Sequence, residues 1–141
     1  MIAVIKVMMG EKGAGKTKVM LEMVNAAANV EMGKVVFINK GNRFMYDLDR
    51  LVRMVNTDDF HIKDLGVFLG FIQGIIAGDY DITHIFIDSL LKAVKADMVE
   101  TEAFLDGLLQ VSERYNVKFT ITISGDASLA TDGVKKYFIK F

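Results

Sequence analysis

The sequence contains no cysteine and no proline, and it has only two histidines. Without cysteine, the chain can form neither disulfides nor zinc sites with thiolate ligands. The two histidines, His61 and His84, are too few for a convincing histidine metal cluster. The absence of proline excludes no class of protein, and nothing in the sequence explains it.

The sequence has neither an excess of charge of one sign nor a long hydrophobic run. Seventeen Lys and Arg against 18 Asp and Glu leave a formal net charge of −1. Domains that bind nucleic acid usually carry a basic excess, so we expect no dedicated nucleic-acid surface. The net charge does not exclude a local basic patch. No apolar run reaches the roughly 18–20 residues of a membrane span, and the N-terminus lacks the order of a signal peptide. We therefore expect a soluble, cytoplasmic protein with no membrane partner.

Short apolar runs alternate with segments of helical periodicity along the whole chain. The 141 residues are 52% hydrophobic and 25% charged, which is ordinary for one domain spanning residues 1–141. Strands that alternate with helices form a parallel sheet covered on both faces. The sequence predicts an α/β fold, a three-layer αβα sandwich around a mostly parallel sheet of about five strands. The expected strands are residues 2–9, 34–39, 83–88, 117–124 and 134–141, and the expected helices are residues 16–32, 43–55, 64–78 and 99–115.

A glycine-rich stretch, "MMGEKGAGKT", follows the first expected strand. Gly10, four further residues and then Gly15-Lys16-Thr17 match the pattern G-x-x-x-x-G-K-[ST] without deviation. Its glycines permit the backbone angles with which successive N–H groups wrap a phosphate, and the following helix presents its free N–H groups to the same anion. The alternative is a glycine-rich turn without a ligand. We call residues 10–17 the glycine loop, and the expected nucleotide-binding residues are Gly10, Glu11, Lys12, Gly13, Ala14, Gly15, Lys16, Thr17 and Lys18.

Three side chains have expected roles in this chemistry. The ammonium of Lys16 would reach the β- and γ-phosphates, and the hydroxyl of Thr17 would join the shell of a Mg²⁺ ion. Such a site also needs a carboxylate at the end of a neighbouring strand. Asp88 ends the strand "HIFIDS" and is the expected metal-holding residue; its alternative role is that of a helix cap or turn residue.

These motifs resemble the P-loop NTPase superfamily, with Gly10 to Thr17 as its Walker A motif and Asp88 closing its Walker B motif. Within the superfamily, "FIDSLL", "ITISGD" and "LATDGVKKYFIKF" resemble the RecA/KaiC-like branch. The resemblance implies the P-loop NTPase fold, binding of ATP or ADP with Mg²⁺, and a polar residue near the γ-phosphate. Ser124 occupies that position, so Lys16 and Ser124 are the expected catalytic residues.

One departure from the branch bears on catalysis. RecA-like proteins usually carry a glutamate after the second strand to activate water, whereas this chain has Lys40 and Gly41 there. Asp47, Asp49 and Glu11 are near in sequence but not at that position. The sequence also ends at Phe141, before the strands that often supply a lysine or arginine finger, which can be worth 10³–10⁵ in rate. We therefore expect nucleotide binding more than hydrolysis.

Three functions stay open at this point. The first is an ATP-Mg binding domain that hydrolyses ATP slowly or only with a partner, and the second is a non-catalytic nucleotide sensor or assembly module. The third, a small-molecule kinase, ranks last because the chain has only four arginines and no segment long enough for a lid. The expected partners are a nucleoside triphosphate and, for assembly, a second copy of the chain or another protein.

A row of glycines in the third expected helix suggests a packing surface. Gly66, Gly70, Gly74 and Gly78 recur every four residues, which places them along one side of a helix. We expect this side to pack closely against the protein's own sheet or a neighbouring helix, with self-association as the alternative.

Overall fold

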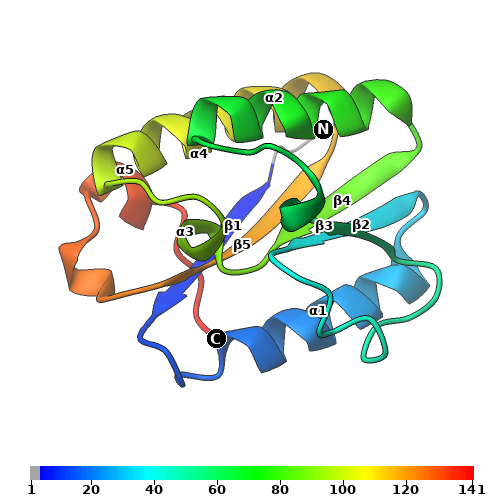
Figure 1. The fold of residues 1–141 in the computed structure, drawn as a ribbon, viewed down its shortest axis with the longest axis horizontal. Coiled ribbons are helices and arrows are strands. Elements are labelled where there is room, and N and C mark those ends of the chain that lie inside the picture. The colour runs from blue at the N-terminus through cyan, green and yellow to red at the C-terminus, as the bar shows by residue number, and fades with distance from the viewer. Residues whose placement is uncertain (1–3) are drawn as a thin grey trace.

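The computed structural model describes residues 4–141 and consists of alternating strands and helices (Figure 1). The first two residues of the expected strand 2–9 lie outside the described residues. The strands are β1 (Ile5–Gly10), β2 (Lys34–Asn39), β3 (Arg53–Asn56), β4 (Ile82–Ile87) and β5 (Lys118–Ser124). The helices are α1 (Lys16–Val30), α2 (Leu65–Gly78), α3 (Leu90–Ala93), α4 (Met98–Tyr115) and α5 (Asp132–Lys135), with 3-10 turns η1 (Thr57–Asp59) and η2 (Ala127–Leu129).

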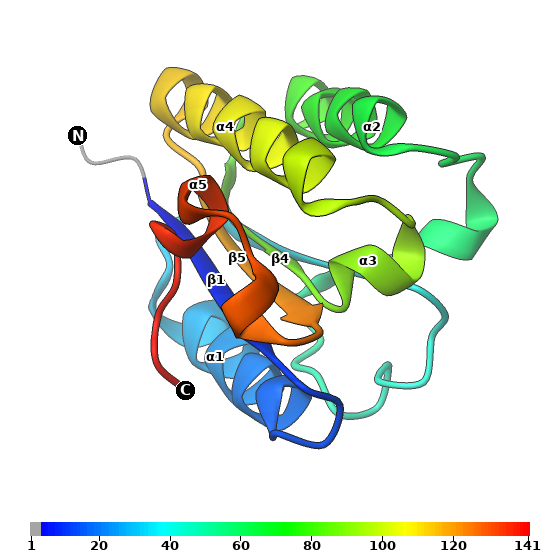
Figure 2. The same ribbon diagram turned by 90° about the vertical axis from the view of Figure 1, so that its left-hand side faces the viewer.

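The five strands form one sheet in the order β1-β5-β4-β2-β3, and every pair is parallel. Helices α2 and α4 cover one face and α1 covers the other, so the sheet is the middle of three layers (Figure 2). Each face of the sheet has its own apolar core. Phe68, Ile72 and Leu105 belong to the core under α2 and α4, and Met20 and Val24 belong to the core under α1. The predicted three-layer α/β fold is confirmed.

The expected helix over residues 43–55 is wrong. Its apolar spacing is real, since Leu48 and Val52 are buried against the α1 face of the sheet. However, the side chain of Asn25 on α1 accepts a hydrogen bond from the Asp49 N–H and donates one to the Asp47 carbonyl, and these are backbone groups that a helix would use. The segment forms successive turns and then strand β3, which pairs with β2.

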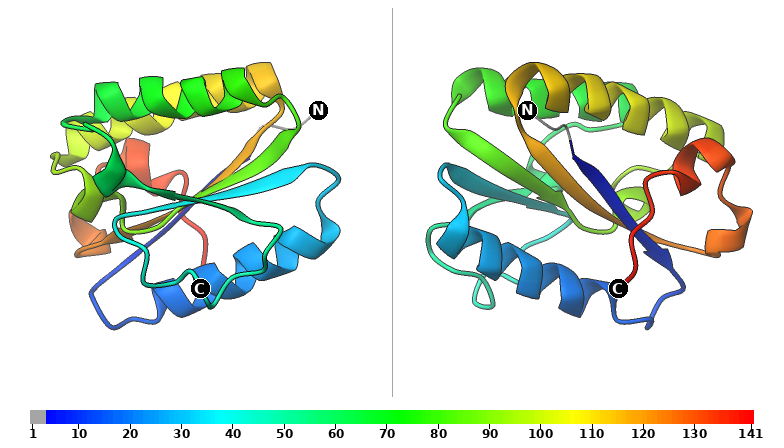
Figure 3. Two further views of the ribbon diagram at one scale, coloured as in Figure 1. Left: turned by 45° about the vertical axis from the view of Figure 1, so that its right-hand side comes forward. Right: turned by 180° about the vertical axis from the view of Figure 1, so that it is seen from behind.

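The expected fifth strand over residues 134–141 is also wrong, although the count of five strands holds because β3 takes its place. Thr131 caps the short helix α5 by accepting a hydrogen bond from the N–H of Val134. Beyond α5, only Phe138 pairs with the sheet, in a single parallel bridge to Val7 of β1. The C-terminal segment therefore runs beside β1 without extending the sheet (Figure 3, right).

The glycine row of α2 does not pack closely inside the molecule. A Cβ atom added at Gly70, Gly74 or Gly78 would meet no heavy atom of the described residues within 4 Å. The expected close packing against the sheet or a neighbouring helix is therefore wrong. Gly70 and Gly74 lie in the interior of α2 and are exposed, so each costs about 1 kcal/mol of helix stability relative to alanine, with no internal contact to offset it.

The parallel arrangement brings the carboxyl ends of all five strands to one edge of the sheet. In open α/β sheets, the crevice outside these ends is the usual place for a ligand. Gly10 and Ser124 end neighbouring strands there, and Asp88 follows β4 directly. Among residues 4–141, no helix has both the length and the apolar character needed to cross a membrane.

Candidate functional site

The glycine loop joins β1 to α1 in a conformation that depends on its glycines. Gly13 and Gly15 have φ angles of +89° and +90°, a left-handed region that other residues rarely adopt. The N–H of Ala14 donates to the carbonyl of Glu11, which closes the turn. Because Gly15 is the residue that precedes α1, the helix begins without a capping side chain or an acidic residue in its first turn. Its first N–H groups therefore stay open to an external acceptor.

Lys16 lies inside this loop rather than in solvent. Its side chain is only 5% exposed, and its Nζ donates hydrogen bonds to the carbonyls of Gly10 (2.7 Å) and Glu11 (3.0 Å). These neutral acceptors satisfy two of the three ammonium protons but leave the positive charge without an anionic partner among the described residues. The neighbouring Thr17 is half-buried in the first turn of α1.

A pocket of about 570 Å³ opens over the loop and the start of α1. Its lining includes five cationic side chains and no carboxylate, in a protein whose net charge is −1. The sequence-predicted residues Gly13, Gly15, Thr17 and Ser124 line it as well. The five cations are Lys12, Lys16, Lys18, Arg43 and Lys92.

Ser124 lies beside the glycine loop because β5 is the direct neighbour of β1. The two strands are in register to their ends, where Gly10 pairs with Ser124, and the N–H of Gly125 donates to the carbonyl of Gly10. The side chain of Ser124 is exposed to the pocket. The structure therefore brings Ser124 to the same pocket as Lys16 and Thr17.

Asp88 is 1% exposed and does not line the pocket itself, whereas the next residue, Ser89, does. Its carboxylate accepts a 2.7 Å hydrogen bond from the hydroxyl of Thr122, which in turn accepts one from the N–H of Ser89. Ser89 itself has a left-handed backbone, with φ of +53°, and turns the chain from β4 into α3. Asp88 is thus held in place by Thr122, a residue that the sequence analysis missed although it lies two positions before Ser124 on the same strand face.

Asn39 is a second polar side chain near Asp88. Strands β2 and β4 are neighbours, and alternation along each of them places Asn39 and Asp88 on the α1 face, after the buried Phe37 and Phe86. Asn39 is 5% exposed, and its Nδ2 has no hydrogen-bond partner within residues 4–141. A buried, unpaired donor beside a buried carboxylate is costly unless a ligand or water meets it.

Arg43 and Lys92 are further pocket residues that sequence reasoning did not find. Arg43 comes from the segment that was expected to be a helix, and its guanidinium lies 4.4 Å from the ring centroid of Phe44. Lys92 comes from α3, a helix of four residues that is too short to have a periodic signal. No local motif marks either residue, since both reach the pocket only through the tertiary fold.

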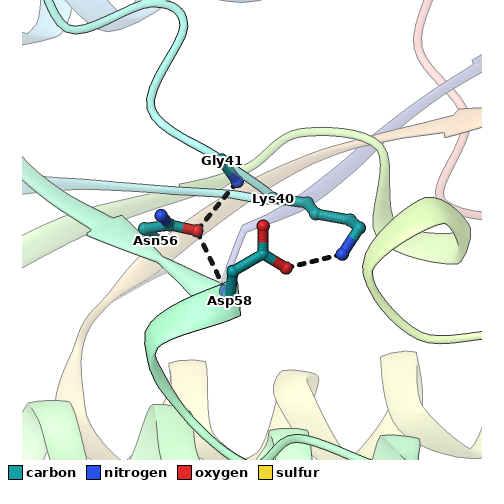
Figure 4. Close-up of polar contacts among 4 residues, drawn as sticks. All are labelled: Lys40, Gly41, Asn56 and Asp58. Atoms are coloured by element: carbon teal, nitrogen blue, oxygen red, sulfur yellow. Dashed lines mark hydrogen bonds and ion pairs between the residues drawn. The ribbon is translucent and has the colours of Figure 1, made fainter.

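The position after β2, where the RecA/KaiC-like branch carries a glutamate, holds a different cluster here (Figure 4). Lys40 forms an ion pair with Asp58 at 2.5 Å. The side-chain oxygen of Asn56 accepts hydrogen bonds from the N–H groups of Gly41 and Asp58, and so ties this turn to the end of β3. The cluster is therefore an internally satisfied junction between two strand ends.

The other carboxylates that were considered for catalysis lie elsewhere. The backbones of Asp47 and Asp49 are bound to Asn25, nine residues along α1 from Lys16. At 1.5 Å per residue, this is about 13 Å along the helix. Glu11 belongs to the glycine loop, but its side chain is exposed and it does not line the pocket.

The residues present fit a nucleotide polyphosphate with Mg²⁺. Five cations, an uncapped helix start and a glycine loop suit a polyanion, while Thr17 and Asp88 offer the oxygen ligands that Mg²⁺ prefers. The described residues contain no group of three or more His, Asp or Glu side chains that could hold a metal without further ligands. Phosphate oxygens and water would complete the coordination of Mg²⁺. The chain matches no protein-family model, and a search of curated proteins finds no significant relative.

Proposed function

We propose that this protein binds a nucleoside triphosphate with Mg²⁺ in the pocket over the glycine loop, as a member of the P-loop NTPase superfamily with a RecA/KaiC-like arrangement. One observation carries the proposal: the pocket joins five cationic side chains, without a carboxylate in its lining, to the uncapped start of α1. In a protein of net charge −1, such a concentration of positive charge suits a ligand with several negative charges.

The roles of the pocket residues follow from their positions. The N–H groups of the glycine loop and of the first turn of α1 would hold the phosphates, and Lys16 would exchange its two carbonyl acceptors for phosphate oxygens. Thr17 and Asp88 would hold Mg²⁺, which would neutralise charge on the terminal phosphates when bound. Ser124 would contact the γ-phosphate, and Arg43 and Lys92, which line the same pocket, would add positive charge around the phosphates.

A non-catalytic sensor or assembly module is the second candidate, and the cluster after β2 favours it. Lys40 pairs with Asp58 where a water-activating glutamate is sought. The backbones of Asp47 and Asp49 bond to Asn25, which lies nine residues along α1 from Lys16. Without a placed base, the transition state for hydrolysis would have electrostatic stabilisation but no group to orient water. Both candidates therefore share nucleotide binding, and they differ in whether slow or partner-dependent hydrolysis follows.

Calorimetric titration of the full chain with ATP, ADP, GTP and dATP, each with and without Mg²⁺, tests the proposal. We expect saturable binding that Mg²⁺ strengthens for the triphosphates. Arg43→Ala and Lys92→Ala should each weaken triphosphate binding, while Lys95→Ala, an exposed lysine beyond α3 that does not line the pocket, serves as the control. Absence of binding by all four nucleotides would refute the proposal.

A further inference from the structure

The outer edge of β3 is open. β3 is the last strand of the sheet and has β2 as its sole neighbour among the described residues. Strand β2 is buried over five of its six residues, whereas Arg53 of β3 is exposed and its other three residues are half-buried. Alternate N–H and C=O groups of such an edge strand point outward, where another strand can pair with them. The opposite edge differs, because Val7 of β1 exchanges hydrogen bonds with Tyr137 and Ile139 of the C-terminal segment.

A groove of about 670 Å³ runs between this edge and α2. Its walls are mainly apolar and include Met54, Phe60 and Phe71, and the rings of the two phenylalanines lie 4.9 Å apart. Gly74 and Gly78 of α2 line the same groove, so the unfilled side of the glycine row faces it. The helix thus presents bare backbone beside an unpaired strand, which permits close approach of another element.

The charges along this edge are arranged as a dipole. Arg53 is the first residue of β3 and Arg50 precedes it by three residues. Asp58, which pairs with Lys40, and Asp59 lie just beyond the end of the strand. Arg53 and Asp59 both line the groove, and neither forms an ion pair within residues 4–141. A second copy of the strand that runs antiparallel across a two-fold axis would bring the basic end of each copy to the acidic end of the other.

We infer that β3 is a self-association surface, on which two copies of this chain pair antiparallel, β3 to β3, and join their sheets into one. The two-fold axis would also bring the two α2 helices together above the junction, with Gly74 and Gly78 at the contact. Such an interface is isologous, because the same patch serves both copies. This inference goes beyond nucleotide binding and does not depend on it.

The charge pattern is the reason to choose a second copy as the occupant. A short edge strand with an arginine is a common protection against pairing. Here the opposite charges at the two ends of β3 oppose a parallel copy, in which like charges meet, and favour an antiparallel one. The same contact would also cover the apolar groove and the glycine side of α2 with the second copy of the chain.

Sedimentation equilibrium of the full chain without nucleotide, from micromolar to near-millimolar protein, tests the inference. We expect a monomer–dimer equilibrium whose dissociation constant rises at least about tenfold in Gly74→Leu, because a leucine would occupy the contact. The variant should fold normally, since a Cβ at position 74 meets no atom within 4 Å. Gln110→Leu is the matched control, because Gln110 is an exposed residue of α4 in the same layer, away from the groove.

A charge exchange tests the antiparallel arrangement separately. Arg53→Glu should weaken the dimer, and the double change Arg53→Glu with Asp59→Arg should restore it, because the two ends remain complementary. A wild-type chain that is monomeric at every concentration would overturn the inference. A dimer whose dissociation constant changes in neither Gly74→Leu nor Arg53→Glu would overturn it equally. A double variant whose dissociation constant stays as high as that of Arg53→Glu would refute the two-fold pairing.

Discussion

The hydroxyl of Thr122 donates a 2.7 Å hydrogen bond to Oδ1 of Asp88 and accepts another, from the N–H of Ser89. Asp88 is the residue proposed to hold Mg²⁺, and it is almost fully buried. Thr122 is therefore the residue that positions this carboxylate and the turn that follows it.

Thr122→Val should lower the free energy of unfolding by about 1–3 kcal/mol, because a buried carboxylate and a backbone N–H lose their partner while the shape of the side chain is kept. It should also weaken the effect of Mg²⁺ on ATP binding. Chemical denaturation and calorimetry measure the two effects. Thr120→Val is the control, since Thr120 is equally buried on the same strand but bonds to His84. An equal loss of Mg²⁺ dependence in both variants would contradict the positioning role.

Asp88→Asn should weaken Mg²⁺-dependent binding of ATP more than metal-free binding of ADP, because it removes the negative charge that attracts the ion. Calorimetric titrations of both nucleotides, with Mg²⁺ for ATP and with a chelator for ADP, make the comparison. Equal losses for the two nucleotides would assign Asp88 a structural role at the end of β4.

His84 should make the protein less stable in mild acid. Burial lowers the pKa of its imidazole from 6.5 to about 4, and Phe86 stacks on the ring. Between these two values the unfolded chain binds the proton and the folded chain does not, so the free energy of unfolding falls as the pH is lowered through this window. The loss is on the order of 3 kcal/mol at most. Denaturation at several pH values measures the free energy of unfolding against pH. This dependence should be flatter in His84→Gln than in the wild type. His61→Gln, which changes an exposed histidine, is the control and should behave as the wild type does. An unchanged slope in His84→Gln would contradict the assignment.

The glycine loop and the fold class were predictable from the sequence because their signals are local. The loop pattern lies in eight consecutive residues, Gly10 to Thr17, and Gly13 and Gly15 have left-handed backbone angles. Strands β2, β4 and β5 and helices α2 and α4 were placed within one or two residues. Buried strands are short apolar runs and long helices have a clear helical periodicity, so both signals are local.

The rest of the site depends on contacts between distant segments. Residues 43–55 have apolar spacing that suits a helix, but bonds to Asn25 and pairing with β2 decide their structure. Arg43 therefore reaches the pocket from a segment of turns. Thr122 and Lys92 also carry no pattern of their own, because their importance comes from the neighbours that the fold gives them.

The isolated protein should hydrolyse ATP very slowly. The pocket lining has cations for the phosphates but no carboxylate to orient the attacking water. Phosphate release measured over a wide range of protein concentration, alongside light scattering, tests this. If hydrolysis needs a group from another subunit, the rate per molecule should rise with assembly. A fast rate that stays constant per molecule in a proven monomer would contradict the prediction. It would direct attention to Glu11, the carboxylate of the glycine loop.

The most direct test of the proposed function is the change in melting temperature that ATP with Mg²⁺ produces in the wild type and in Lys16→Ala. A ligand that binds only the folded state raises the melting temperature, and the rise grows with the logarithm of its concentration relative to its Kd. We expect a clear rise in melting temperature in the wild type and little or none in Lys16→Ala, whose circular dichroism should stay unchanged. Lys63→Ala, which changes an exposed lysine outside the pocket, is the control and should show the same rise as the wild type. An equal rise in Lys16→Ala, or no rise in the wild type, would contradict the assignment of the glycine loop as a phosphate site.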